Sequence, residues 1–298
     1  MANNTKNSNP IVTSLPDYVE QNVLPLIAKS VLGAKSASMF NLQTDVKGPT
    51  KLNLISTDVT LQDASTCGFK ATGSTTLSQR QITPKYLKVN MQWCDKELLG
   101  TWAQYQVKVA AGQKELPFEE EFVNGVVENV KAAIEKMIYT GDSTNANEFD
   151  GLIKILKADG ALTETRKSTV YETIKAVYAK LPETAIADDT VILVGAGDFR
   201  TFIQELVAAN LYHYEASDVA GEYTLPGTAV KVVSVNGLNG TNTVIAGRLS
   251  NMFYGTDMAN DEEKFDLWYS KDDQVFKLAI EFVAGVQVAF PNEVVIAE

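Results

Sequence analysis

Histidine is almost missing from this chain of 298 residues: it has one, His213, together with two cysteines, Cys67 and Cys94. A single histidine excludes any site built from two histidines, and two thiols in a chain of this length do not make a disulfide framework. Cys94 lies in an apolar, strand-like run, and we interpret it as a small buried hydrophobe. The motifs GxxxxGK[ST], GxSxG, HExxH and CxxC do not occur.

Positive charge and long apolar runs are scarce as well. The formal net charge is -11 at pH 7, which disfavours direct phosphate binding to nucleic acid but says nothing against a container for it. No apolar stretch approaches 18 residues. The start, Met1 to Pro10, is polar and Asn-rich, unlike a signal peptide. We therefore expect no membrane contact and a protein that is made and kept in a cytoplasm.

Two short motifs could carry chemistry, and for both a structural role is favoured. Gly195-Ala196-Gly197 resembles the start of a dinucleotide fingerprint, but Arg200 occupies the third glycine position. A tight turn between a strand and a helix explains it better than a cofactor does. His213 stands between two tyrosines, and no nucleophile can be named beside it. We expect no catalytic residues and no cofactor.

Acidic residues gather in four short clusters. Paired carboxylates can do acid–base work or hold a cation, but local clusters of this kind are usually solvated turns and helix starts. One cluster, Asp261–Glu263, could hold a divalent ion at a junction between subunits, which is the weaker interpretation. We expect no metal site. The clusters are Glu119–Glu121, Asp188-Asp189, Asp261–Glu263 and Asp272-Asp273.

The first 90 residues divide into a helical segment and a hairpin, residues 41–90, and the hairpin contains few large apolar side chains. Residues 1–13 are expected to be disordered, and a helical segment follows from near Pro16 to Gly33, kinked or broken at Pro25. Its weak amphipathicity suits an arm lying on a neighbouring molecule. Residues 41–90 read as a long β-hairpin with a mobile tip between Gln62 and Gln79. The hairpin's expected strands are Lys51–Ile55, Thr57–Leu61 and Arg80–Asn90.

The strongest periodicity in the chain predicts one long helix over residues 118–139. Pro117 suits its first turn, Glu119–Glu121 suit the positive end of its dipole, and Gly141 could end it. Twenty-two residues correspond to roughly 33 Å of helix. The apolar side chains that recur every fourth residue are Phe118, Phe122, Val126, Val130, Ile134 and Ile138.

The second half of the chain alternates helices and strands and then becomes mostly β. Thr169 and Glu172 form a capping box for a helix over residues 169–181. Thr190–Val194 is predicted to be a buried strand, and Asp198 is predicted to cap a helix running to Ala209. One-sided alternation of apolar and polar residues predicts a strand over Phe276–Phe282, and further strands are expected at Val286–Phe290 and Val294–Ile296. This order of elements indicates an α+β fold.

Four runs of residues make the chain resemble the major capsid proteins of tailed bacteriophages, whose fold is named after phage Hong Kong 97. The first leads from Ser14-Leu15-Pro16-Asp17-Tyr18-Val19 to Phe40, and the second is the hairpin running into Gln92–Leu99. The third joins Tyr139-Thr140-Gly141-Asp142 to Phe149-Asp150-Gly151-Leu152. The fourth comprises Asn251–Asp257, Phe276–Phe282 and Gly285–Pro291.

The resemblance covers nearly the whole chain and implies a structural protein, not an enzyme. It implies pentamers and hexamers that close into an icosahedral shell around double-stranded DNA, in a virion built in a bacterial host. Further implied partners are a scaffolding protein, a portal and decoration proteins. The implied domains are an N-arm (1–40), an E-loop hairpin (41–91), a peripheral domain (92–165 and 245–285) and an axial domain (166–244 and 286–298).

The chain departs from the family in its N-terminal part. Some relatives carry a cleaved scaffolding segment of about a hundred residues, whereas here only about 40 residues precede the hairpin. Either a separate scaffold exists or a leader is already absent. Some relatives also join a hairpin lysine to an asparagine; Lys51, Lys70 and Lys85 are the lysines here, and Asn292 is one possible partner. The alternatives are an encapsulin-like nanocompartment shell and a soluble α/β enzyme with a mobile flap.

Overall fold

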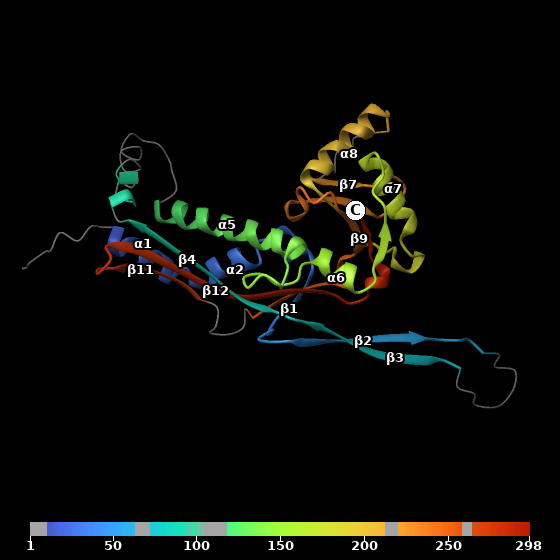
Figure 1. Cartoon of the computed structure of the whole chain (residues 1–298), viewed down its shortest axis with the longest axis horizontal. Helices are drawn as coiled ribbons and strands as arrows, with labels where there is room; N and C mark the ends of the chain where they lie inside the picture. Colours follow the sequence, from blue (N-terminus) through green and yellow to red (C-terminus); the bar gives the residue numbers. More distant parts are fainter. Residues whose placement is uncertain are drawn as a thin grey trace, which may run out of the picture.

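The computed structural model of the chain describes residues 11–62, 72–94, 96–98, 100–101, 103, 118–211, 220–257 and 264–298 (Figure 1). Pro117, His213, Lys70, Cys67 and the cluster Asp261–Glu263 therefore lie outside the described residues. Within the described part, a five-stranded sheet runs beside a long helix, a six-stranded sheet lies beyond the end of that helix, and a thin two-stranded hairpin projects from the body. No described helix is long and apolar enough to cross a bilayer.

The longest strand, β12 (Val275–Val288), organises a five-stranded sheet. Along its first half β12 pairs with two antiparallel strands, one on each side, and its second half pairs with a third. Its four alternating apolar side chains, Phe276 to Phe282, are all buried, as the sequence predicts. The separate strand expected at Val286–Phe290 is instead the last part of β12, which ends at Val288, and Gly285 within it lies close to the backbone of Pro84. The other strands are β1 (Asn41–Gln43), β4 (Lys85–Cys94), β10 (Met252–Thr256) and β11 (Lys264–Ser270).

A six-stranded sheet occupies the other end of the molecule, in the order β5-β13-β9-β6-β8-β7. Its central strand β6 is buried along its whole length, in agreement with the buried strand predicted at Thr190–Val194. Alternate residues of β6 enter two different cores, so the strand is apolar on both faces. The strands are β5 (Leu162–Glu164), β6 (Thr190–Gly195), β7 (Glu222–Thr224), β8 (Lys231–Val235), β9 (Val244–Arg248) and β13 (Val295–Ala297).

Two helices cover one face of this sheet, α7 (Val170–Lys180) and α8 (Ala196–Ala208). Thr169 caps α7 by accepting a hydrogen bond from the Glu172 backbone N–H at 3.2 Å, which is one half of the predicted capping box, and the Glu172 carboxylate accepts from the Ser168 hydroxyl at 3.1 Å. The prediction that Asp198 caps α8 was wrong: Gly195 is the N-cap and Asp198 lies in the first turn. The cap position is close to another backbone, since a Cβ on Gly195 would lie 2.8 Å from the Leu238 carbonyl oxygen. Only glycine fits there.

Helix α5 (Phe118–Thr140) confirms the long helix read from the sequence and connects the two sheets. It shares a core with the five-stranded sheet, where Phe122 meets Trp93 of β4 edge to face, and then packs against η2 (Asn236–Leu238), a 3-10 turn at the end of β8. A Cβ on Gly237 would lie 2.2 Å from the Glu135 carbonyl oxygen and 2.3 Å from the Tyr139 ring. This close backbone contact, which we call the joint, fixes the long helix to the six-stranded sheet.

The chain leaves α5 through a turn that brings two backbones together. Gly151 donates its N–H to the Gly141 carbonyl at 2.8 Å, and a Cβ on either glycine would clash with backbone atoms. Helix α6 (Leu152–Ala158) then leads into β5. Gly141 therefore follows the helix because of close approach, not because it needs a left-handed backbone.

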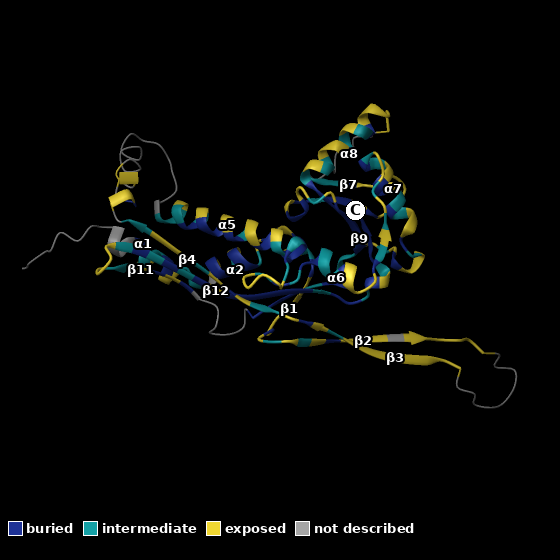
Figure 2. Ribbon diagram, in the orientation of Figure 1, coloured by how far each residue is buried: buried dark blue, intermediate teal, exposed yellow. Residues whose placement is uncertain are grey.

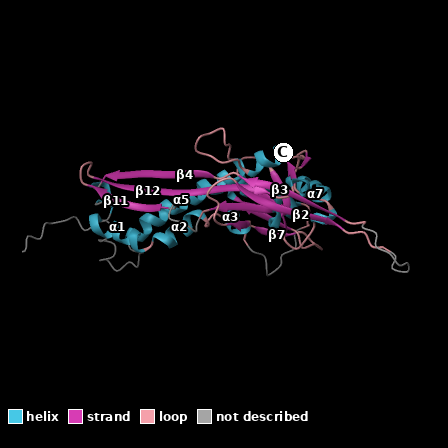
Figure 3. Cartoon of the chain, turned by 90° about the horizontal axis from the view of Figure 1, so that it is seen from below, coloured by secondary structure: helices cyan, strands magenta, loops and turns pink. Residues whose placement is uncertain are grey.

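The N-terminal helices belong to the same body. Residues 11–40 form α1 (Ile11–Gln21), α2 (Val23–Val31) and α3 (Lys35–Met39). The break falls at Asn22, so Pro25 lies in the first turn of α2, where its missing N–H is tolerated, and Pro16 lies inside α1. Disorder was expected up to residue 13, but α1 begins at Ile11. Figure 3 shows α1, α2 and α5 on one face of the five-stranded sheet.

The hairpin is shorter than the sequence suggested. Its strands are β2 (Thr50–Asp58) and β3 (Ser74–Ile82), which form a two-stranded sheet with Thr50 opposite Ile82 and Asp58 opposite Ser74. Residues 74–79 therefore belong to a strand and not to the tip. The strand expected at Arg80–Asn90 is two strands divided at Thr83-Pro84, and the second, β4, pairs with β12 in the five-stranded sheet.

The joint predicts opposite effects for two glycine substitutions. Gly237→Ala should lower the free energy of unfolding by about 1–3 kcal/mol, because its methyl group overlaps the α5 backbone. The matched control is Gly125→Ala in the same helix, where a Cβ meets nothing within 4 Å and stability should rise by about 0.5–1 kcal/mol. Urea denaturation of the unassembled chain measures both, and equal effects would contradict a tight joint.

Candidate assembly surfaces

The hairpin formed by β2 and β3, here called the ribbon, exposes apolar side chains to solvent. Ile55 and Leu77 face each other across the two strands, and they are 66% and 74% exposed. Towards the tip, Val59 is 72% and Leu61 94% exposed. A two-stranded sheet without a core is marginal in water. The ribbon therefore has an apolar outer face that its own chain leaves uncovered among the described residues (Figure 2).

The root of the ribbon is fixed to the body by a small core of its own. Val46, Leu52 and Ile82 are buried together, with Phe253 packed against them. The Gln287 side-chain amide donates to the Gln81 carbonyl at 2.8 Å. The ribbon thus leaves the five-stranded sheet at a defined place, and its inner face, which carries Leu52, turns towards the body.

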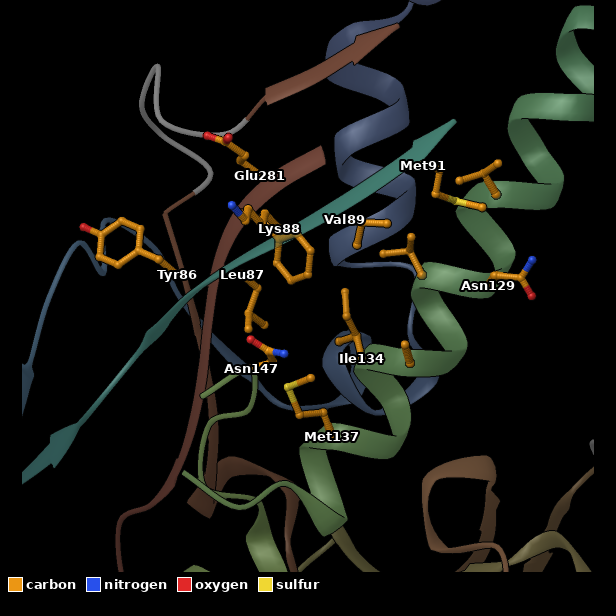
Figure 4. A pocket seen from close by; sticks show the side chains of 14 residues that line it. Tyr86, Leu87, Lys88, Val89, Met91, Asn129, Ile134, Met137, Asn147 and Glu281 are labelled. Atoms are coloured by element: carbon orange, nitrogen blue, oxygen red, sulfur yellow. The ribbon is translucent and has the colours of Figure 1, made fainter. Parts of the chain in front are cut away.

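An apolar groove of about 520 Å³ lies between β4 and α5, on the body of the molecule (Figure 4). Methionine side chains from both walls reach it, Met91 from the strand and Met137 from the helix, and Asn129 and Asn147 stand at its rim. Flexible thioethers adapt to irregular partners, so such a lining suits protein side chains. Its remaining lining residues are Tyr86, Leu87, Lys88, Val89, Val126, Val130, Ala133, Ile134, Glu281 and Phe282.

Strand β4 forms one wall of the groove and is also an edge of the five-stranded sheet, since β12 is its pairing partner within the described part of the chain. Its exposed side chains include Lys88 and Met91, and Tyr86 donates its hydroxyl to the Lys47 carbonyl at 2.6 Å. Lysines on an edge strand discourage indiscriminate strand pairing. Cys94 ends this strand and is half-buried, where burial was expected.

The N-terminal segment does not have the surface expected of an arm lying on a neighbour. Leu15, Val19, Leu26, Val31 and Phe40 are all buried in the main core of their own chain. That expectation was wrong from residue 15 onward, because the apolar faces of α1 and α2 pack on α5 and β11. Among the described N-terminal elements, only the ribbon therefore exposes a large apolar face.

A buried carboxylate holds this segment to the spine helix. Glu135 of α5 accepts hydrogen bonds from the Ser36 backbone N–H at 2.9 Å and from the Ser36 hydroxyl at 2.6 Å. The Tyr139 hydroxyl lies 2.6 Å from the same Ser36 oxygen. Burial, together with the nearby Glu135 carboxylate, raises the pKa of Tyr139, so its hydroxyl stays protonated. The first turn of α3 is thereby tied to α5.

The residues considered for chemistry in the sequence are scattered. Gly195-Ala196-Gly197 opens α8, where the Ala196 N–H donates to the Asn239 side chain at 2.7 Å. Asp198 in that first turn forms a bidentate pair with Arg166, at 2.8 and 2.9 Å. A carboxylate in the first turn and an occupied N–H do not suit a phosphate, which agrees with the structural reading of this motif.

The described acidic clusters are also spread over the surface. Glu119–Glu121 begin α5, Asp189 accepts from the Ser250 N–H at 3.0 Å, and Asp273 is paired with Lys277. Hydrogen bonds from Lys277 and Ser270 lower the pKa of Asp273. Across the described residues, no three His, Cys, Asp or Glu side chains gather as metal ligands. Lys51 lies exposed on the ribbon and Asn292 lies in η4 (Pro291–Glu293).

Comparison with known proteins gives structural matches without sequence matches. No family model matches the chain, and no curated protein matches it. A structure of the satellite phage P4 procapsid including size determination protein superposes with a TM-score of 0.60 at 10% identity, over 94% of this chain and 90% of that one. The capsid of an empty GTA particle gives 0.56 at 11% identity, over 90% and 89%.

This chain has the capsid fold named after phage Hong Kong 97. A virus-like particle from Pyrococcus furiosus shares the capsid fold too, with a TM-score of 0.54 at 9% identity, over 93% of this chain and 98% of that one. The α+β arrangement expected from the sequence is confirmed. At sequence identities of 9–11%, these similarities show a shared fold and nothing further.

The buried network predicts that the N-terminal segment contributes to stability. Glu135→Ala should lower the free energy of unfolding by about 1–3 kcal/mol, because the Ser36 N–H and hydroxyl lose their acceptor inside the core. Glu135→Gln keeps an acceptor oxygen and should lose less. Glu128→Ala, on the exposed side of the same helix, should change stability by less than about 0.5 kcal/mol. Chemical denaturation of the three variants tests the order.

Proposed function

We propose that this chain is the structural subunit of an icosahedral phage capsid, which assembles with copies of itself into pentamers and hexamers around double-stranded DNA. The observation that carries the proposal is the ribbon: an extended, apolar-faced element without a partner surface in the described part of its own chain. The capsid fold supports the same reading. Such a subunit acts through repeated contacts and needs no catalytic group.

The ribbon and the groove supply two complementary halves of one contact. The groove begins at Tyr86, just beyond the root of the ribbon at Ile82, and the ribbon points away from the body, so Ile55 and Leu77 lie outside the groove of their own chain (Figure 1). A neighbouring copy can receive them. Such a contact is heterologous, and heterologous contacts that close on themselves produce rings.

The energy of this contact is modest for each copy. Burying Ile55 and Leu77 contributes about 1.5–3 kcal/mol per side chain before the cost of association is subtracted. The polar rim of the groove, with Asn129, Asn147 and Lys88, provides orientation more than affinity. Because every subunit makes the contact once as donor and once as acceptor, multivalency makes the closed shell far more stable than one pair.

The domains of this subunit follow the sheets in our proposal. Residues 1–40 take the place of the N-arm, with residues 15–40 packed on the body of their own chain, and 41–91 form the E-loop region, whose described core is the ribbon. The peripheral domain, 92–165 and 245–285, contains α5, β10, β11 and most of β12; the other two strands of the five-stranded sheet, β1 and most of β4, come from the 41–91 region. The axial domain contains the six-stranded sheet, within 166–244 and 286–298; because β5 and β9 belong to this sheet, we place 162–164 and 244–248 with it.

Further partners follow from assembly in a bacterial cytoplasm. We propose a scaffolding protein that guides shell formation, a portal at one vertex and decoration proteins on the finished virion. DNA is enclosed without sequence-specific contacts, in keeping with the net charge of -11. The expected location is the capsid of a virion, away from membranes.

An encapsulin-like nanocompartment is the second candidate, favoured by the likeness to the virus-like particle from Pyrococcus furiosus. The two candidates differ in their contents. Purified particles that protect DNA from nuclease support the capsid, whereas particles that hold a co-purified protein and no DNA support the nanocompartment. Negative-stain microscopy that finds only small oligomers would contradict both.

Substitutions on the ribbon predict loss of assembly without loss of folding. Leu77→Asp should reduce shell formation at least tenfold, because a carboxylate cannot enter an apolar groove without a large desolvation cost. The control Thr76→Asp places the same charge on the other face of β3 and should assemble normally. Sedimentation and microscopy measure assembly, and circular dichroism checks folding. Equal assembly of the two variants would contradict docking through the outer face.

The groove predicts a second pair of variants, one test and one control, on α5. Ala133→Glu places a charge in the groove at an exposed helical position and should block assembly to a similar extent. Ala132→Glu, one residue earlier and outside the groove lining, should assemble like the unaltered chain. Shells of normal yield from Ala133→Glu would exclude the groove as the docking site and leave the capsid proposal standing.

A further inference from the structure

Arg80 links the ribbon to the body at the level where the ribbon leaves it. Its guanidinium pairs with the carboxylate of Asp159 at the end of α6. The two side chains are 24% and 32% exposed, so solvent reaches them only in part and salt screens the pair less than a fully exposed one. In the register of the ribbon, Arg80 stands opposite Leu52, which is buried in the root core.

The two partners belong to different parts of the fold. On the Arg80 side, β3 continues through Thr83-Pro84 into β4 and thus into the five-stranded sheet. On the Asp159 side, the chain continues within three residues into β5 of the six-stranded sheet. The pair therefore spans the ribbon and the connection between the two sheets, and any rotation of the ribbon against the six-stranded sheet changes its length.

Asp159 is held firmly, which makes it a suitable fixed point. Gly160 follows it with φ of +78°, and the Ala161 N–H returns to the Leu156 carbonyl at 3.1 Å, the pattern of a Schellman helix end. Lys157, two residues before it, pairs with Glu298 next to β13 at 2.7 Å. The backbone that carries Asp159 is thus held by the end of α6 and, through Lys157, by the C-terminal residue next to β13.

A small rotation at the root of the ribbon becomes a larger displacement at its far end. The Ile55–Leu77 pair lies three residues beyond Arg80 and the Asp58–Ser74 pair six, which is about 10 and about 20 Å at roughly 3.3 Å per residue. A rotation of about 10° at the root therefore moves the Ile55–Leu77 pair by about 2 Å and the outer end of the ribbon by about 3–4 Å. To keep these side chains in its groove, a neighbouring subunit must tilt by the same angle.

We propose that the Arg80–Asp159 ion pair is a latch that sets the angle of the ribbon, and so determines whether neighbouring subunits meet at the curvature of one closed shell. The consequence for assembly rests on the proposed function, whereas the angle is a property of the single subunit. Weakening the latch frees the ribbon to sample other angles. Assembly then continues through the same apolar contact but gives particles of mixed size and open sheets.

The angle is measured on the full, unassembled chain. Spin labels at Thr57→Cys on the ribbon and Lys175→Cys on α7, in a Cys67→Ser, Cys94→Ser background, report the distance between the ribbon and the six-stranded sheet. Asp159→Asn should at least double the width of the distance distribution, and 1 M salt should broaden the unaltered chain in the same direction. The control Asp273→Asn removes an ion pair with Lys277 away from the ribbon and should leave the width unchanged.

Exchanging the charges of Arg80 and Asp159 distinguishes loss of the ion pair from a general loss of structure. Arg80→Asp should broaden the distribution, and the double variant Arg80→Asp, Asp159→Arg should restore a narrow one. An unchanged width in Asp159→Asn, or no recovery in the exchange variant, would overturn the latch even if shells form.

If the unaltered chain never forms shells while the widths change as stated, the capsid proposal fails and the latch stands. If it forms shells, microscopy should show at least a threefold broader spread of particle sizes for Asp159→Asn, and a uniform population would overturn the role in curvature.

Discussion

The contact between α5 and η2 is the constraint on which the rest of this fold depends. Two backbones approach so closely at Gly237 that no side chain fits between them. Because α5 also covers the five-stranded sheet, this one joint sets the relation between the two sheets. The buried network involves the same two residues of α5, Glu135 and Tyr139, and adds the N-terminal helices to the same unit. The result is a stiff body along one spine.

Among the described elements, the ribbon is the one that projects from this stiff body. The ribbon has no core beyond its root, so its outer face gains stability only by contact with another molecule. The groove between β4 and α5 lies on the rigid part, where its walls keep a constant separation. A preformed groove and a ribbon held at its root lower the entropic cost of docking, because little of either surface must become ordered. When such a contact is repeated around a ring of subunits, the rings can join into a closed shell.

Sequence reasoning succeeded where local pattern and tertiary structure agree. The apolar repeat of α5, the one-sided alternation of β12 and the buried β6 were readable because each buries the face that its period predicts. It failed where long-range packing decides. The division at Thr83-Pro84 follows from pairing between β4 and β12, nearly 190 residues apart in sequence. The burial of α1 and α2 depends on surfaces contributed by α5 and β11. A weakly amphipathic segment looks the same whether it covers its own core or a neighbour's.

The sequence by itself determined the α+β class, the spine helix, the existence of a hairpin with little core and the lack of recognisable catalytic motifs. These properties depend on composition and on periodicities of a few residues, which one segment can express alone. Only the tertiary structure decided that the N-terminal helices are part of the body, that an apolar groove lies beside β4, and that Arg80 meets Asp159. Each of these needs segments distant in sequence to come together, and no local pattern specifies which distant surface a face will meet.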